Sequence, residues 1–239
     1  MTPAAPLVAA RQVVKNYQAL RPLRIEDLAV TAGEIVSLVG LDAPGAEILV
    51  GLLTGAIVPD SGEVRLFGRS TSEVADSDAW LAMLDGVGIL TDRAVLIGQF
   101  TIEQNIAMPF TLTVDPIASD VQPAVEALAR ELGLEGNDLK SPVGTSSASA
   151  QALVRLGRAL ALKPKLLLAE HPSASLPRDR VKEFAATITR IARARALAVL
   201  AITADEMFAE ALGGQYLRLD PATGALRPRR SWSKLFNRS

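Results

Sequence analysis

The sequence predicts an α/β protein built on a parallel β-sheet that helices cover on both faces. Short apolar runs typical of strands alternate along the chain with longer segments of helical periodicity. Two of these runs, residues 166–169 and 196–202, are apolar along their whole length, as strands buried on both faces are. Hydrophobic residues make up 49% of the chain and aromatic residues only 4%. Aliphatic side chains would therefore fill the core, which suits α/β layers better than a β-sandwich.

The first third of the chain predicts a small antiparallel β region that leads into a central strand. Turn-like residues such as Ala32-Gly33 separate its β-branched runs, and Pro59-Asp-Ser-Gly62 has the composition of a tight turn. The predicted elements are strands at 13–14, 23–30 and 35–36, a strand over 63–68, a short helix over 76–84 and a buried strand over 86–90.

Between residues 92 and 163 the pattern becomes helical. Apolar residues at 121, 125, 128 and 132 line one helical face, and Gly133 ends that helix. Prolines at 109 and 164 end two other helices. The predicted elements are helices over 101–108, 118–132 and 150–162, a strand over 166–169, an amphipathic helix over 179–195 and a strand over 196–202.

Composition limits the class of protein. The formal net charge of the 239 residues is -1, so no basic field indicates a nucleic-acid partner. The absence of cysteine excludes a disulfide framework and a thiolate site, and it fits a reducing cytoplasm. The N-terminus lacks the pattern of a secretory signal, and no apolar run reaches the roughly 18 to 20 residues of a membrane span. We expect any membrane contact to be peripheral or through a partner.

Residues 35–55 predict a buried strand, a glycine-flanked loop and an apolar helix, which is how many proteins hold a nucleotide phosphate. In the pattern G-x-x-x-x-G-K-[ST], loop amides cradle the phosphate, the lysine neutralises charge and the hydroxyl binds magnesium. Gly40 and Gly45 have this spacing, but Ala46 and Glu47 follow them. The sequence therefore retains the scaffold of a phosphate loop without its chemistry.

The order of segments resembles the nucleotide-binding domain of ATP-binding cassette (ABC) proteins from Val13 to Leu219. The resemblance rests on residues 31–36, 53–55, 59–64, 101–106 and 158–168. It implies a P-loop NTPase fold with a RecA-like core sheet, a small antiparallel β region and an α-helical subdomain. It also implies a dimer that sandwiches ATP, and its spacing favours the importers and the lipid or lipoprotein transporters.

This resemblance implies one domain over residues 1–239. The implied parts are a core over about 7–91 and 164–220, a helical subdomain over about 92–163 and a basic tail over 222–239.

The positions that carry chemistry in the family are mostly altered here. The L-S-G-G-Q signature falls on residues 146–150, where only Ser147 matches. Glu170 stands at the magnesium-supporting aspartate, His171 at the catalytic glutamate and Ala204 at the switch histidine. The magnesium-sensing glutamine falls near Asp92, and Pro177 stands where a later loop carries an aspartate. Tyr17 matches the aromatic residue that stacks on adenine.

The residues of the loop itself oppose anion binding. Pro44 lacks an amide hydrogen, and Asp42 adds a negative charge. Glu47 is expected in the first turn of the helix, where its carboxylate would satisfy the helix N-terminus. We interpret Gly40 and Gly45 as a tight turn retained for folding, with Tyr17, Gly40, Gly45 and Ser147 as any residual nucleotide-binding residues.

His171 is the only histidine in the sequence. It could act as a general base, with Glu170 holding a metal-bound water, because imidazole titrates near neutrality. The other interpretation is a noncatalytic histidine satisfied by its neighbours. We favour the second, and we expect no metal, unless at Glu170, and no catalytic residue at the degenerate positions 46, 47, 170, 171 and 204.

These observations predict a noncatalytic ABC subunit of a membrane transport complex, cytoplasmic and peripheral to the membrane. Its expected partners are a membrane permease and either an intact ABC ATPase or a second copy of the chain, and nucleic acid is not expected. No cofactor is expected, or ATP and Mg²⁺ if activity remains. The alternatives are an ATP-hydrolysing subunit with unusual residues and a soluble regulator without a transporter.

The C-terminal residues 227–239 form a basic segment. Trp232, Leu235 and Phe236 have the spacing of one helical face, which would suit an anionic membrane surface or a partner groove. A solvated tail is the alternative.

Overall fold

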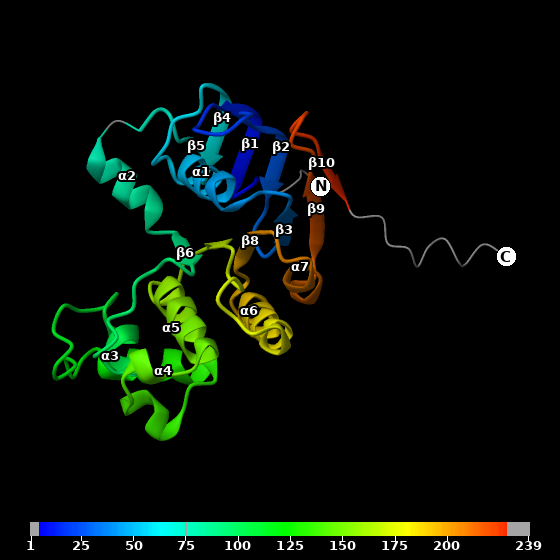
Figure 1. The fold of residues 1–239 in the computed structure, drawn as a ribbon. Helices are drawn as coiled ribbons and strands as arrows, with labels where there is room; N and C mark the ends of the chain where they lie inside the picture. The colour runs from blue at the N-terminus through cyan, green and yellow to red at the C-terminus, as the bar shows by residue number, and fades with distance from the viewer. Residues whose placement is uncertain (1–4, 75, 229–239) are drawn as a thin grey trace.

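The computed structural model describes residues 5–74 and 76–228, and its main feature is a six-stranded sheet (Figure 1). The strand order is β10-β9-β3-β8-β7-β6, and every neighbouring pair is parallel except β10 and β9. The strands are β3 (Ile35–Val39), β6 (Val87–Thr91), β7 (Leu166–Glu170), β8 (Ala198–Thr203), β9 (Gln215–Leu219) and β10 (Leu226–Pro228). The predicted parallel sheet is confirmed.

A second, antiparallel sheet has the order β2-β1-β4-β5. Its strands are β1 (Val8–Lys15), β2 (Leu23–Val30), β4 (Ser61–Leu66) and β5 (Arg69–Ser70). This sheet confirms the antiparallel region predicted from the first third of the chain. The strand predicted over 63–68 begins earlier, so Ser61 and Gly62 belong to β4 and not only to the turn. Gly62 has φ 85 and lies against the backbone of Gln12, where a side chain would not fit.

Helices occupy the connections between the strands. They are α1 (Ala43–Thr54), α2 (Ser77–Leu84), α3 (Ile102–Ala107), α4 (Gln122–Leu132), α5 (Ala148–Leu160), α6 (Val181–Arg195) and α7 (Glu206–Leu212), with short 3₁₀ turns at Gly136–Lys140, Val143–Thr145 and Arg178–Arg180. In Figure 1, α3, α4 and α5 gather into a helical part beside the sheets. The predicted fold class, with core sheet, antiparallel region and helical part, is confirmed.

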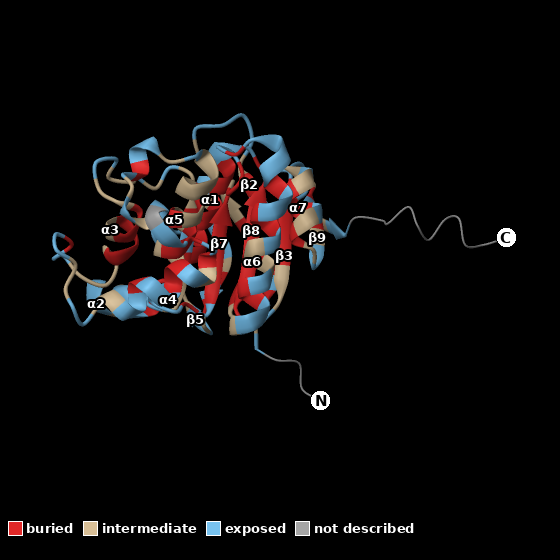
Figure 2. Ribbon diagram, turned by 90° about the horizontal axis from the view of Figure 1, so that it is seen from below, coloured by how far each residue is buried: buried red, intermediate tan, exposed pale blue. Residues whose placement is uncertain are grey.

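The core has two layers, one on each face of the parallel sheet. Leu166, Leu168 and Leu200 pack with α1 and the antiparallel sheet, whereas Leu167 and Val199 pack with the helices of the other face. Figure 2 shows the buried strands between exposed helix surfaces. Successive side chains of a strand point to opposite faces, so a strand that is buried on both faces must be apolar throughout. This agrees with the apolar runs at residues 166–169 and 196–202.

Several helix boundaries follow from local residues. Thr101 and Gln104 form a capping box at the start of α3. Gly133 ends α4 in a left-handed conformation, as predicted, although α4 begins at Gln122 instead of 118. The predictions did not include α7, β9 or β10, which follow Thr203.

The helical part is tied to the core by an arginine. Arg195, at the end of α6, donates to both carboxylate oxygens of Glu131 on α4 and to the carbonyl of Leu160 on α5. The bidentate geometry favours one orientation of the helices over others. This contact joins α4 and α5 to α6.

The segment predicted as a basic tail begins inside the fold. Residues 226–228 form β10, in which Arg227 pairs with Arg218 of β9 in the strand register. The aromatic residues of the tail prediction lie in 229–239, outside the described residues. No helix within 5–74 or 76–228 is both long enough and apolar enough to cross a lipid bilayer.

Candidate nucleotide site and partner groove

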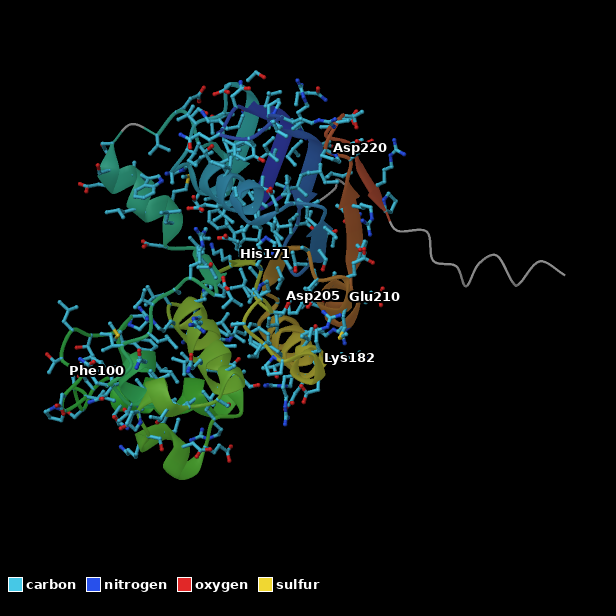
Figure 3. All side chains as sticks on the ribbon, viewed as in Figure 1. Phe100, His171, Lys182, Asp205, Glu210 and Asp220 are labelled. Atoms are coloured by element: carbon cyan, nitrogen blue, oxygen red, sulfur yellow. The ribbon has the colours of Figure 1, made fainter. Side chains whose placement is uncertain are left out.

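The positions that resemble nucleotide-binding motifs meet at the carboxyl ends of the parallel strands. Gly40 follows β3, Arg93 follows β6 after one intervening residue, His171 follows β7 directly, and Ala204 follows β8. Figure 3 shows His171 in the middle of the molecule, where the sheet approaches the helical part. In open α/β sheets this edge is where ligands bind, because loops from several strands converge there.

The loop after β3 supplies its own anion. The Asp42 carboxylate caps α1 and accepts a hydrogen bond from the amide of Gly45 at 2.9 Å. Helix α1 begins already at Ala43, with Pro44 in its first turn. The sequence suggested that Glu47 would satisfy the helix N-terminus. That prediction was wrong, because Asp42 caps the helix instead. The amide that a phosphate would meet is already bound.

Gly40 is required by the backbone, whereas Gly45 is required by the side chains packed against it. Gly40 has φ 114, and a Cβ there would lie 3.0 Å from the carbonyl oxygen of Leu219. A Cβ on Gly45 would lie 2.9 Å from the Asp42 carboxylate and 3.3 Å from the hydroxyl of Tyr17. These contacts give both glycines a structural reason that needs no phosphate.

Ala46 and Glu47 have different surroundings. Ala46 is fully buried and belongs to the core layer that contains α1. Glu47 is exposed on one side, and its carboxylate lies 2.6 Å from Nη1 of Arg93.

Arg93 joins two carboxylates that the sequence places far apart. Its Nη1 contacts Glu47, and its Nη2 donates to both oxygens of Glu170 at 2.8 Å. Glu170 ends β7 and is 4% exposed, so its charge depends on this partner. Hydrogen bonds to Glu47 and then to Glu170 raise the pKa of Arg93 above its usual value. One guanidinium therefore pairs with the carboxylates of Glu47 and Glu170, so carboxylates outnumber cations in this contact.

His171 contacts Ala204, the residue that stands where the family resemblance implies a switch histidine. Its Nδ1 accepts a hydrogen bond from the amide of Ala204 at 3.4 Å, which assigns the proton of a neutral ring to Nε2. Nε2 is buried without a partner in the described part of the chain. His171 also has φ 42, a left-handed conformation that costs energy in a residue with a side chain. Neither ring nitrogen is presented as a free acceptor for a proton.

A hollow of about 350 Å³ beside His171 is organised by Asp205. Both residues line this hollow, and both are labelled in Figure 3. Asp205 caps α7 by accepting from the amides of Met207 and Phe208, and it also accepts from the hydroxyl of Ser173 at 2.9 Å. The loop after β7 is thus fastened to the start of α7.

Tyr17 lies against the loop after β3. Its pKa is raised, first by partial burial and second by the charge of Asp42. The preceding residues are fixed by Asp60, whose carboxylate accepts from the amide of Asn16 at 2.7 Å and from Lys15 at 2.8 Å. Asp60 therefore fixes the two residues before Tyr17, whose hydroxyl lies beside Gly45.

We expect Asp60→Asn to weaken the fold at neutral pH and to have little effect in acid. Hydrogen bonds from Lys15 and then Asn16 lower the pKa of Asp60 from 3.8 to about 2. The folded state thus favours the carboxylate, and this contribution is present above pH 3.8 and is lost as the pH falls toward about 2. Urea unfolding of both proteins at neutral pH and at about pH 2 checks this. Asp27→Asn is the control, because Asp27 pairs with Arg11 at 3.8 Å and both side chains are exposed. An equal pH dependence in both variants would contradict the expectation.

Ser147, the one signature residue that matches, is a helix cap. Its hydroxyl accepts from the amide of Ala150 at 3.2 Å at the start of α5. Ala148 and Ser149 form the first turn of the helix in place of two glycines. The cap gives Ser147 a local structural role.

A separate apolar groove of about 520 Å³ runs between α2, β6 and α5. Leu81, Ile89 and Leu162 line it and are 54%, 41% and 62% exposed. Arg155 and Arg158 also line it and donate to the carbonyls of Ala94 and Val95, the residues that follow Arg93. Burial and then the charge of Arg155 lower the pKa of Arg158. No ion pair of either arginine is found among the residues that the structure describes.

Sequence reasoning missed Arg93 and Asp205. Arg93 follows a predicted buried strand directly after the position of the magnesium-sensing glutamine, which is a signal for a residue near the site. Asp205 precedes Glu206-Met-Phe-Ala, a pattern typical of a helix start. Neither signal identifies the partner residue.

Comparisons with known proteins agree with this geometry. Residues 23–174 match the ABC transporter family. The lipoprotein-releasing system ATP-binding protein LolD 2 of Caulobacter vibrioides is 36% identical over 182 residues, covering 72% of this chain and 76% of that protein. LolD of Psychrobacter arcticus is 28% identical over 191 residues, covering 80% and 84%.

The fold is also found in a solved structure. The structure of cbiO1 from Clostridium perfringens, part of the ABC transporter complex cbiONQ, matches with a TM-score of 0.79 at 15% identity, covering 98% of this chain and 92% of that one. This likeness supports the cassette fold assigned above. The chain therefore belongs to the ABC transporter family, among its ATP-binding cassette proteins.

Proposed function

We propose that this protein is a noncatalytic cassette subunit of a membrane transport complex, which contributes a docking surface and no ATP hydrolysis. The observation that carries the proposal is the bond from the Gly45 amide to the Asp42 carboxylate. An anion of the chain itself fills the place where loop amides hold phosphate in a working site.

The charges around the loop support the same conclusion. A lysine is missing at position 46, and Ala46 is buried in the core. The carboxylates of Asp42, Glu47 and Glu170 outnumber the guanidinium of Arg93, and ATP is itself strongly negative. Like charges in a partly buried site repel strongly because water screens them less. ATP does not fit these residues as they stand.

Hydrolysis by unusual residues has less support. A general base must accept a proton from water, but Nδ1 of His171 is engaged by the Ala204 amide and Nε2 is buried. Glu170, the residue that would anchor a metal-bound water, has both carboxylate oxygens on Arg93.

The proposed partner is a membrane subunit that inserts a short helix into the groove between α2, β6 and α5. Its apolar lining calls for an apolar helix face, and the arginines at 155 and 158 call for a carboxylate on that helix. The relatives are named as ATP-binding proteins of transport systems, which supports a membrane partner. A soluble regulator would leave this groove without an occupant. We propose on these grounds that the protein lies at the cytoplasmic side of a membrane. Pairing with a second cassette could occur while the groove binds its membrane partner.

Calorimetric titration with ATP, with and without Mg²⁺, tests the noncatalytic part of the proposal. We expect no heat of binding and no phosphate release, because Asp42 occupies the loop and the site is acidic. Asp42→Ala is the informative variant, since it frees the Gly45 amide while shortening one side chain. Micromolar binding with turnover that is lost in His171→Ala would contradict the proposal and favour an ATPase with unusual residues.

A photo-crosslinking amino acid at Ile89 tests the partner in intact membranes. We expect a crosslink from Ile89 to a membrane-spanning subunit and none from Leu20, an exposed leucine outside the groove. Crosslinks only to soluble proteins would favour a regulator without a transporter.

A further inference from the structure

The position of Arg93 raises the question of whether this site has any use for the divalent cation that ABC cassettes bind with ATP. Three chain segments bring one cation to two carboxylates: the loop after β6 supplies Arg93, α1 supplies Glu47 and β7 supplies Glu170. Carboxylate oxygens are the ligands that Mg²⁺ prefers, so the donor atoms alone would suit a metal.

Arg93 already engages those oxygens, which leaves them unsuited to bind a metal. Both oxygens of Glu170 accept from Nη2 of Arg93 at 2.8 Å, and Oε2 of Glu47 lies 2.6 Å from Nη1. A divalent ion bound by the same oxygens would stand beside a guanidinium, and two cations at that separation repel. Among residues 5–74 and 76–228, no group of three His, Cys, Asp or Glu side chains is placed to hold a metal ion. The residues therefore do not fit Mg²⁺ while Arg93 remains in place.

We propose that Arg93 is a tethered cation that replaces the divalent ion, joining the helix after the loop to the ends of β6 and β7 without metal. This inference deepens the proposed noncatalytic function and rests on it. The guanidinium is planar and offers several donors at fixed angles, so one side chain can bridge Glu47 and Glu170 as a metal would. It also keeps the buried charge of Glu170 compensated.

The consequence is a fold whose stability is independent of divalent ions. In the wild-type chain, we expect the same melting temperature in EDTA, in Mg²⁺ and in Mn²⁺. A metal that bound the folded state would raise the melting temperature progressively as its concentration increased. A rise that depends on Mg²⁺ or Mn²⁺ in the wild-type chain, and is lost in Glu170→Gln, would overturn the proposal.

Removal of Arg93 should convert the site into one that takes a metal. Arg93→Ala leaves Glu47 and Glu170 without their cation, so we expect a melting temperature lower by several degrees and restored in large part by Mn²⁺. Electron paramagnetic resonance of Mn²⁺ should show the ion bound to Arg93→Ala and free with the wild-type chain. The triple variant Arg93→Ala, Glu47→Gln, Glu170→Gln should lose Mn²⁺ binding, because its carboxylates are gone.

Arg65→Ala is the matched control. Arg65 also has a half-exposed side chain and a carboxylate at 2.6 Å, but its partner Glu63 is itself half-exposed, whereas Glu170 is buried. This variant should neither lose several degrees nor bind Mn²⁺. If Arg93→Ala does not accumulate as folded protein, Arg93→Gln with the same Mn²⁺ titration replaces it, and the wild-type melting test needs no variant. A variant at position 93 that is folded and binds no Mn²⁺ would overturn the replacement.

The two proposals fail separately. Mn²⁺ binding by the wild-type chain without nucleotide would contradict the proposal that Arg93 replaces the metal. The proposals about the partner groove and the loop after β3 would still stand. Binding of ATP in EDTA would contradict the proposal that the loop does not bind nucleotide. The proposal that Arg93 replaces the metal would still stand.

Discussion

Ile89→Glu combined with Leu162→Glu should separate the protein from its membrane partner. Both side chains line the groove between α2, β6 and α5. The new carboxylates would put charge in an apolar contact, pair with Arg155 and Arg158 and repel the carboxylate that we expect on the partner helix. With about 2 kcal/mol for each anchor residue, the loss of affinity amounts to about a thousandfold. Recovery of the tagged chain with membranes, measured by sedimentation and immunoblot, checks this.

The control for the groove variant is Leu20→Glu with Leu112→Glu. These leucines are fully exposed and lie outside the groove, so the change adds the same charge to the surface. Melting temperatures of both double variants should match the wild type, because none of the four side chains is buried. Equal membrane recovery of the groove variant and the control would remove the groove from the proposal.

Ala46→Lys combined with Glu47→Ser should produce an unstable protein and no ATPase. The pair restores the lysine and the hydroxyl of the phosphate-loop pattern. Ala46 is fully buried in a core layer, so a lysine there overpacks the helix against the sheet at a cost of about 1–3 kcal/mol. Loss of Glu47 also removes one partner of Arg93. We expect a total loss of about 3 kcal/mol, measured by urea unfolding, with no phosphate release above the wild type.

Two single variants separate the causes. Glu47→Ser alone tests the contact with Arg93, and Ala46→Ser alone changes the buried position with little added volume. Turnover in the double variant would mean that the altered signature, His171 and Ala204 matter less than we infer.

The sequence and the structure agree most closely where local pattern is decisive. Residues 166–169 and 196–202 were predicted as strands buried on both faces, and β7 and β8 are neighbouring interior strands whose side chains contact both core layers. Gly133 ends α4 because only a residue without a side chain enters that conformation at no cost. The region after Thr203 was not assigned, because α7 has seven residues and β9 has five, too short for a clear period.

In the candidate site, too, local sequence predicts some features and only the structure gives the others. The missing lysine, hydroxyl and signature glycines are visible at positions 46, 47, 148 and 149, because the loop motifs are local in sequence. Glu47 illustrates the limit of that reasoning. Its place in the sequence suggested a bond to the helix N-terminus, whereas the shorter Asp42 reaches the Gly45 amide and leaves Glu47 to Arg93.

The sequence by itself determined the α/β class and the phosphate-loop scaffold, and it places Ala46 and Glu47 where the pattern has lysine and a hydroxyl. Only the tertiary structure decided which residues meet at the site. Arg93 meets Glu170 across 77 residues of sequence, and His171 meets Ala204 across 33. Parallel strands bring their carboxyl ends to one edge of the sheet whatever their separation in the chain, so the partners at that edge depend on strand order. That order is a property of the packed molecule and not of any one segment.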